Sequence, residues 1–196
     1  AFFQSFMVIV PVIVPFFMSK GLSLAEIFYL QAVFATSIVL LEAPSGYFAD
    51  VFGRRNALII GSVAHGLAYL CLNFTDDLAG LIVFEIIAGI GASLLSGADL
   101  ALLYDTQKAL EDDLNNEPGN GIAHLGFVKS SAEALGALLG GGLALWSFDL
   151  MVAAQSVAAW MCLILAVLII EPPYKKEKQN ENRVQLVAIL RHLFNG

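Results

Sequence analysis

Four ionisable residues stand inside long apolar stretches of this sequence, where charge is unexpected. They are Glu42, Asp99, Lys129 and Glu133. A charged group in such a stretch is costly, and those that occur are candidates for substrate, ion or proton pathways. A carboxylate placed there can exchange a proton or bind a cation. We therefore predict that these four residues line a solute or proton pathway, with a structural hydrogen bond as the alternative for Glu42.

Three of these groups have a spacing that would bring them together. Lys129 and Glu133 are four residues apart, so they share one face of a helix. Asp99 lies on the preceding apolar stretch, which would run antiparallel, and it falls at a similar depth. We predict a functional Asp99–Lys129–Glu133 network. The alternative is a neutralised ion cluster that only fixes packing.

Two further ionisable groups fall in apolar stretches. Glu85 is predicted nearer to the opposite end of its helix from Asp99, where it would line a vestibule or reach water. His65 falls near the middle of its stretch. We interpret it as a hydrogen-bonded packing residue, and a proton relay is the alternative because histidine titrates near neutral pH.

The sequence pattern contains no recognisable catalytic constellation. No Ser–His pair or pair of aspartates stands at helical spacing inside the apolar stretches. Cys71 and Cys162 lack the spacing of metal ligands, and the remaining histidines, His124 and His192, share no spacing either. We therefore assign no catalytic residue, no cofactor and no metal ligand, and we predict that the protein is not an enzyme.

The composition points to lipid as the solvent for much of the surface. The 196-residue chain is 58% hydrophobic and 14% charged, with a mean hydropathy of +0.77. Soluble domains are about 45–50% apolar and about 25% charged. The net charge is −7, and nothing in the sequence supports nucleic-acid binding, which would need a basic face.

The apolar stretches predict an all-α, polytopic membrane protein with six transmembrane helices. Each stretch approaches the roughly 20 residues that a bilayer core requires. Short, turn-like segments join most of them, and the connection 105–120 is the long one. A polar tail follows the last stretch. The predicted spans are 1–18, 24–48, 56–74, 78–104, 121–147 and 150–171.

The distribution of Lys and Arg predicts the orientation in the membrane. Cytoplasmic loops carry an excess of these residues. One side would hold Lys20 alone, and the other side would hold eight basic residues. These are Arg54, Arg55, Lys108, Lys175, Lys176, Lys178, Arg183 and Arg191. Segments 46–55 and 105–120 and the C-terminal tail are therefore predicted to be cytoplasmic.

Small residues at four-residue spacing mark two of the predicted helices. Such stripes allow helix backbones to approach closely in membranes. Close packing is the first interpretation, and a surface that slides during a rocking motion is the alternative. The stripes are Gly89, Ser93 and Gly97 on one helix, and Ala132, Gly136, Gly140 and Ala144 on the next.

A turn between the second and third spans reads G-Y-F-A-D-V-F-G-R-R from Gly46 to Arg55. Gly46 would permit a close helix approach, and Gly53 tolerates the backbone angles of a sharp turn. Asp50 suits a helix start, because a carboxylate there accepts backbone N–H groups and complements the helix dipole. The paired Arg54 and Arg55 can each reach an acid on a neighbouring helix.

This segment resembles the loop signature of the major facilitator superfamily, G-x-x-x-D-x-x-G-R-[RK], and every position is filled. The resemblance implies that the cluster latches a cytoplasmic gate and that Asp105 joins it. Glu42-Ala-Pro44-Ser-Gly46 is similar to a sequence that precedes the signature in bacterial members. The stretch from Gly136 matches only part of a glycine–proline motif of proton-driven exporters, so the direction of transport stays open.

The resemblance covers the chain as an N-terminal six-helix half. It implies a bundle at 1–171 and a cytoplasmic linker with a short amphipathic helix at 172–196. The missing half would follow, or a second copy would replace it, because the ionisable face of a single half would otherwise meet lipid. We also interpret the chain as lacking residues at its N-terminus.

The implied function is a secondary transporter that moves a small solute by alternating access. A proton on Glu42 or in the Asp99–Glu133 region would couple the movement to a gradient. A facilitator without proton flux and a non-transporting scaffold or receptor are the alternatives. The expected partners are the lipid bilayer, a small solute and a proton, and the expected location is a bacterial inner membrane. The substrate stays open.

Overall fold

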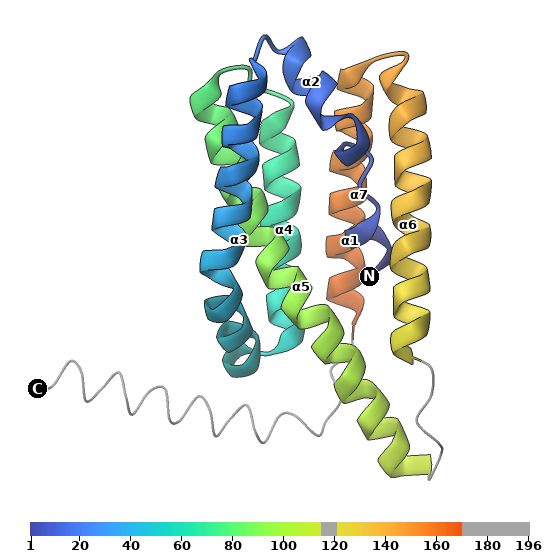
Figure 1. Ribbon diagram of the computed structural model, residues 1–196. Helices are drawn as coiled ribbons and strands as arrows, with labels where there is room; N and C mark the ends of the chain where they lie inside the picture. The colour runs from blue at the N-terminus through green and yellow to red at the C-terminus, as the bar shows by residue number, and fades with distance from the viewer. Residues whose placement is uncertain (115–120, 170–196) are drawn as a thin grey trace, which may run out of the picture.

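A computed structural model describes residues 1–114 and 121–169 of the chain, and every regular element in them is a helix. Figure 1 shows the long helices standing side by side in one bundle. The elements are α1 (Phe2–Ser5), η1 (Val10–Val12), α2 (Ile13–Ser19), α3 (Leu24–Phe52), α4 (Arg54–Leu72), α5 (Leu78–Leu114), α6 (Gly121–Ala144) and α7 (Phe148–Leu168).

Five segments of the described chain are long and apolar enough to cross a bilayer. They are Phe2–Ser19, Leu24–Phe52, Arg54–Leu72, Leu78–Ala98 and Phe148–Leu168. Helix α6 has 24 residues, but Lys129 and Glu133 reduce its apolar character. The prediction of an all-α polytopic membrane protein is confirmed, whereas the sixth span depends on α6 and stays a prediction.

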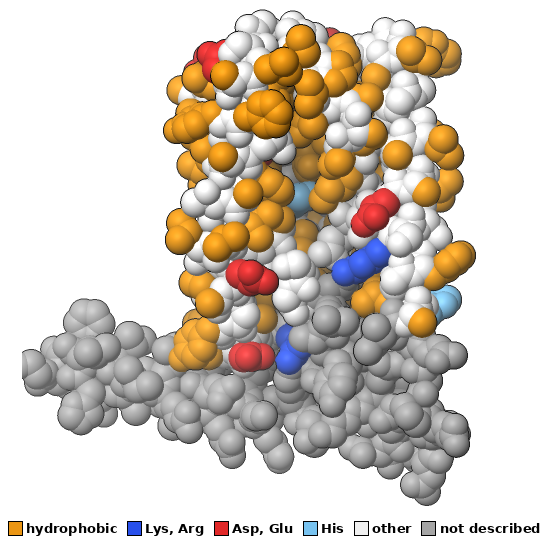
Figure 2. All heavy atoms as spheres, viewed as in Figure 1, with side chains coloured by type: hydrophobic (Ala, Val, Ile, Leu, Met, Phe, Trp, Pro, Cys, Tyr) orange, Lys and Arg blue, Asp and Glu red, His pale blue; other side chains and the backbone are white. Residues whose placement is uncertain are grey.

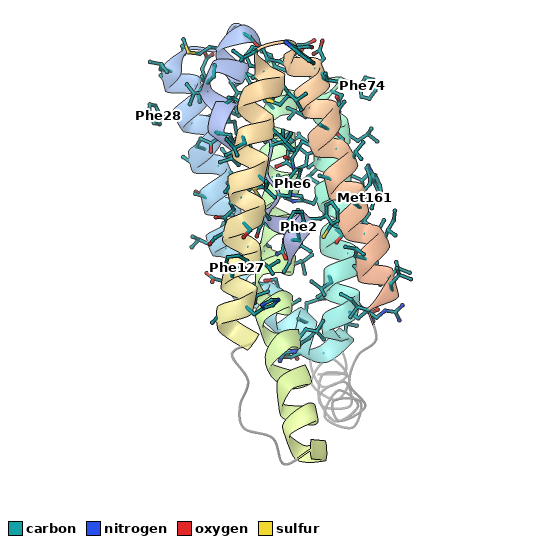
Figure 3. All side chains as sticks on the ribbon, turned by 90° about the vertical axis from the view of Figure 1, so that its right-hand side faces the viewer. Phe2, Phe6, Phe28, Phe74, Phe127 and Met161 are labelled. Atoms are coloured by element: carbon teal, nitrogen blue, oxygen red, sulfur yellow. The ribbon has the colours of Figure 1, made fainter. Side chains whose placement is uncertain are left out.

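Large apolar side chains cover the outside of the bundle. Phe74 is 82% exposed and Trp146 is 84% exposed. Figure 3 shows Phe28 and Phe74 pointing away from the bundle, whereas Phe2 and Phe6 lie within it. This surface suits contact with lipid chains, because water would not solvate it favourably.

The core lies between the helices at the end of the bundle that contains α2. Its fully buried members come from segment 6–9 and from α2, α3, α4, α5 and α7, and they include Ile9, Phe17, Leu30, Leu72, Leu81 and Met151. A second cluster around Ala57, Leu95 and Ala98 packs α4 against α5 nearer the other end. The two clusters make α3, α4, α5 and α7 one packed unit.

Local signals mark where several helices begin and end. The hydroxyl of Ser23 accepts the Glu26 N–H, and the Glu26 carboxylate accepts the Ser23 N–H at 2.8 Å, so α3 begins with a reciprocal cap. Gly53 has a φ of +102°, which a residue with a side chain rarely adopts, and it separates α3 from α4. The predicted sharp turn at Gly53 is confirmed.

The first predicted span is not a continuous helix. Residues 6–9 interrupt it between α1 and η1. Pro11 and Pro15 follow closely, and a proline removes an N–H and disfavours helix geometry in the residue before it. The hydropathy of this stretch predicted a span correctly, but its continuity was wrong.

Helix α5 is longer than the sequence predicts. It runs for 37 residues to Leu114, so the first part of the predicted loop 105–120 is helical. Glu, Lys, Gln and Leu are good helix formers, and a polar helix can continue into water beyond a bilayer. Figure 1 shows this extension at the same end of the bundle as the α3–α4 turn. Residues 115–120 and the predicted boundary at 171 and linker 172–196 lie outside the described residues.

Candidate functional site

A cavity of about 480 Å³ opens between the first span and helices α4, α5 and α6. This volume suits a small organic molecule. Figure 2 shows the face between α5 and α6 hollowed at mid-height, with charged side chains gathered along its lower part. The polar residues that line the cavity are Gln4, Ser5, His65, Ser96 and Glu133, and the apolar ones are Met7, Val10, Pro11, Ala92, Leu95 and Ala137.

The break in the first span forms one wall of this cavity. Gln155 of α7 is 1% exposed, and its side-chain oxygen accepts the N–H groups of Val8 at 2.6 Å and of Ile9 at 3.4 Å. Backbone groups at membrane depth must be satisfied within the protein. Gln155 therefore replaces the hydrogen bonds that the break removes from the helix.

Two glycines of α6 allow the break to lie against that helix. A Cβ at Gly140 would overlap the carbonyl oxygen of Val8, and one at Gly136 would lie 3.0 Å from the Met7 nitrogen. The interpretation of this small-residue stripe as a close-packing surface is confirmed at these two positions. Its contact is the backbone of the first span, which the spacing alone could not identify.

The small-residue stripe of α5 packs on a different helix. A Cβ at Gly89 would lie 2.6 Å from the Ser37 Cβ of α3. The Ser45 hydroxyl of α3 donates to the Ser93 carbonyl at 3.0 Å. A Cβ at Gly97 would meet no atom of the described residues within 4 Å, so the close packing ends before it.

His65 lines the cavity from α4 and is 6% exposed. Its ring meets the Tyr69 ring edge-on, with centroids 5.0 Å apart. Its Nδ1 is buried and neither accepts nor donates a hydrogen bond within the part of the chain that the structure describes. The interpretation of His65 as a hydrogen-bonded packing residue is therefore wrong for this nitrogen.

The structure places the predicted α5–α6 network only in part. Glu133 is exposed and lines the cavity, and Lys129 is half-buried one turn away on α6. Asp99 lies on α5, but its side chain is outside the described part. The Asp99–Lys129–Glu133 network stays a prediction.

Glu42 is exposed on α3 and is not among the residues that line the cavity. Pro44 follows within the same helix, which continues to Phe52. The hydroxyl proton of the next residue, Ser45, is shared between the Glu42 and Ser93 carbonyls, each at 3.0 Å. The structure thus separates Glu42 from Glu133, and their predicted pathway roles do not converge at this cavity.

The α3–α4 turn brings together part of the predicted latch. Asp50 lies in the last turn of α3, however, so the prediction that it stands at a helix start is wrong. An Arg54 nitrogen lies 3.5 Å from an Asp50 carboxylate oxygen, and the Asp50 side chain is 56% exposed. Arg55 donates to the Val167 carbonyl near the end of α7 at 2.5 Å. The side chain of Asp105 on α5 lies outside the described residues.

The predicted close approach at Gly46 does not occur among the described residues. No atom of the described residues lies within 4 Å of the position of a Cβ there. Glu85 also departs from its prediction, because it is 3% exposed and accepts a hydrogen bond from the Gln31 amide at 3.3 Å. It therefore neither reaches water nor lines an open vestibule.

Sequence reasoning missed the structural roles of Gln155 and of the break. A lone amide in the otherwise apolar stretch of α7 was the available signal, together with two prolines in the first span. Prolines show where helical hydrogen bonds fail, but they do not show which residue replaces them. Gln155 lies 147 positions from Val8, so only the fold reveals the pair.

The chain was compared with known proteins. The family model of the Major Facilitator Superfamily matches residues 1–196. An "Uncharacterized transporter" of Buchnera aphidicola subsp. Schizaphis graminum (strain Sg) is 32% identical over 73 residues. This stretch covers 37% of the present chain and 18% of that relative.

Proposed function

The chain belongs to the Major Facilitator Superfamily, and from this premise we propose that it serves a secondary transporter that moves a small solute by alternating access. The observation that carries the proposal is the cavity of about 480 Å³ between the first span, α4, α5 and α6. A membrane-embedded cavity with a few polar groups on an apolar wall can exchange water contacts of a solute for protein contacts. The transporter-named relative from Buchnera supports the same class of function.

The α3–α4 turn is the proposed gate. Asp50, Gly53, Arg54 and Arg55 would hold the cytoplasmic ends of the helices together in one state and release them in the other. Gly46 and Asp105 would join from α3 and α5. The Asp50–Arg54 contact supports this role because it is long, at 3.5 Å, and the Asp50 side chain is 56% exposed, so water can replace the arginine at this carboxylate.

Coupling to protons is proposed through acids on the hollowed face. Glu133 is the acid at the cavity, and Asp99 and Lys129 would complete its network. Glu42 would act elsewhere, on the exposed side of α3. A carboxylate that alternates between solute and proton links the two movements, since each occupant excludes the other.

The hollowed face is also the proposed contact for a second six-helix half or a second copy of this chain. Glu133 is exposed at this face on α6, the predicted sixth span, and would otherwise meet lipid. The exposed Glu42 lies on α3, which is long and apolar enough to cross a bilayer, and it would also meet lipid. The ends that carry the α3–α4 turn and the α5 extension are proposed to face the cytoplasm. The membrane would be a bacterial inner membrane.

The test is solute-driven flux in proteoliposomes that contain the complete protein and a pH-sensitive dye. Substrate-triggered proton movement that is lost in Glu133→Gln would support coupled transport. Asp149→Asn is the matched control, because Asp149 is exposed in the first turn of α7 and does not line the cavity. Flux of radiolabelled solute without proton movement would indicate a facilitator. Absence of flux with every solute, from protein shown to be folded, would overturn the proposal of transport.

A further inference from the structure

We propose that the cavity at the break of the first span binds a small organic amine in its ammonium form, and that His65 contacts this solute. The proposal rests on the proposed function, because it names the solute class for the same cavity. It adds a solute contact on α4, where the sequence predicted packing or a proton relay. Three observations carry it: the His65 nitrogen, the charge of the lining and the fixed backbone of the break.

His65 is buried but its hydrogen-bonding capacity is not fully used. Its Nδ1 makes no hydrogen bond with any described residue, and the 6% of the residue that stays exposed belongs to a cavity wall. Buried polar atoms in proteins are nearly always hydrogen-bonded, so an exception requires a reason. Because no described protein group holds Nδ1, a turn of the ring that presents a nitrogen to a solute would break no hydrogen bond at that atom.

The charge of the lining selects for a cation. Glu133 is the acid among the lining residues, and no Lys or Arg of the described chain is one of them. An ammonium group offers N–H donors to the Glu133 carboxylate and to an imidazole nitrogen, and both are acceptors. A carboxylate solute would meet Glu133 with a like charge, which is unfavourable.

The apolar part of the lining, which stands beside the polar Gln4, Ser5 and Ser96, suits the apolar body of such an amine. Met7, Val10, Pro11 and Leu95 supply apolar surface from the first span and from α5. The cavity volume of about 480 Å³ is sufficient for an aromatic ring with a short alkyl chain. The solute class is therefore an amphiphilic monoamine rather than a polyol.

The break gives this wall a fixed shape. Gln155 holds the Val8 and Ile9 N–H groups, and the closeness of Gly140 to the Val8 carbonyl fixes the backbone from the other side. A wall that is held before the solute arrives needs little reorganisation on binding. The apolar contacts at Met7 and Val10 are therefore ready for the solute.

Equilibrium binding to the complete protein in lipid nanodiscs tests the proposal with three matched probes. Radiolabelled phenethylamine carries the ammonium, phenethyl alcohol is its neutral counterpart, and phenylacetate is an anion of similar size. We expect saturable binding of phenethylamine, at least tenfold weaker binding of the alcohol, and no saturable binding of phenylacetate. Absence of saturable amine binding, or tighter binding of either counterpart, overturns the solute class.

Variants of His65 test the contact itself. His65→Phe keeps a ring of similar shape without a nitrogen, and we expect it to weaken amine binding about tenfold. His65→Gln restores a hydrogen-bonding group and should recover most of the affinity. His124→Phe is the matched control, because His124 is exposed on α6 and does not line the cavity. If wild type and His65→Phe bind the amine with equal affinity, and the melting temperature shows that the variant is folded, the contact is overturned.

Binding and transport separate this inference from the proposed function. Glu133→Gln should weaken amine binding and remove the preference for the amine over the alcohol. If the amine binds but no solute crosses the membrane, the cavity assignment stands and transport fails. If phenylacetate is transported and phenethylamine is not bound, transport stands and this inference fails.

Discussion

The α3–α4–α5 side of the bundle and the side formed by the first span and α6 are built differently. On the first side, long continuous helices cross closely, with Gly89 against Ser37 and Gly61 against Gly91. Ser45 adds a hydrogen bond to the Ser93 carbonyl. On the second side, α6 packs against a chain that is not helical at residues 6–9, and a cavity opens beside it.

This difference assigns distinct tasks to the two sides. Continuous helices with buried small residues have few alternative packings, so the first side serves as a rigid support. The broken span exposes backbone and side chains to a cavity, and it depends on a few specific contacts rather than on a ladder of helical hydrogen bonds. The proposed solute site therefore lies on the side whose structure depends most on single residues.

The largest effect is expected from a substitution at the closest contact of the second side. In Gly140→Ala the new Cβ overlaps the Val8 carbonyl. Overpacking of this kind costs about 1–3 kcal/mol and sometimes more. We expect a lower melting temperature in detergent and loss of transport.

Gly142→Ala on the same helix is the control for this change. A Cβ there meets no described atom within 4 Å, and alanine is the better helix former. Its melting temperature should be unchanged or higher. Equal melting temperatures for the two variants would contradict the close contact between α6 and the break.

The second prediction removes the acceptor that holds the break. Gln155→Met has a similar shape but leaves the Val8 and Ile9 N–H groups without their partner. An unsatisfied buried group costs about 1–3 kcal/mol. Hydrogen exchange at these two amides should become faster, and solute binding should weaken.

A cavity residue provides the control for Gln155. Gln4 lines the same cavity but is not the residue that holds the Val8 and Ile9 N–H groups. Gln4→Met should therefore leave exchange at Val8 and Ile9 unchanged. Unchanged exchange in Gln155→Met as well would show that another group holds the break.

The two sides also differ in how far the sequence predicted them. Apolar length and turn residues are local signals, so the all-α membrane fold and the turn at Gly53 could be predicted. The break could not, because an apolar average over residues 1–18 does not register a loss of helix. The continuation of α5 to Leu114 was missed since its acids resembled a loop.

The candidate site shows the same division. Glu133 was found because its charge is conspicuous in an apolar stretch, and it does line the cavity. His65 was assigned to packing because its position alone does not reveal a missing hydrogen bond. Glu85 was placed near water, whereas the fold buries it beside Gln31. In each of these cases, residues distant in sequence determine the environment of the side chain.

The third prediction addresses the rigid side at its turn. Gly53→Ala places a side chain at a φ of +102° and a ψ of +143°, close to a region that is essentially restricted to glycine, which costs about 1–3 kcal/mol for a residue with a Cβ. Gly46→Ala is the matched control in the same motif, because Gly46 is helical and a Cβ there meets no described atom within 4 Å. The melting temperature should fall in Gly53→Ala and stay level in Gly46→Ala. A fall in both would indicate a contact at Gly46 that lies outside the described residues.

The smallest expected effect on stability concerns the ion pair of the proposed gate. Asp50 and Arg54 are 3.5 Å apart, and the side chain of Asp50 is 56% exposed whereas that of Arg54 is 13% exposed. Such a pair contributes about 0–1 kcal/mol and is screened by salt. Asp50→Asn should therefore shift the melting temperature by little, and the shift should vanish in high salt.

Transport should respond to the same change much more strongly if the pair belongs to a latch. A two-state equilibrium is altered by any contact that exists in one state alone, so a change of about 1 kcal/mol shifts the population ratio several-fold. We expect Asp50→Asn to change accessibility of the cytoplasmic end to a thiol reagent, measured at a cysteine introduced near the turn, while the melting temperature stays level. Asp149→Asn, at an exposed site outside the turn, should change neither quantity. If accessibility in Asp50→Asn also matches wild type, Asp50–Arg54 only connects two helix ends, and the rigid side takes no part in gating through this pair.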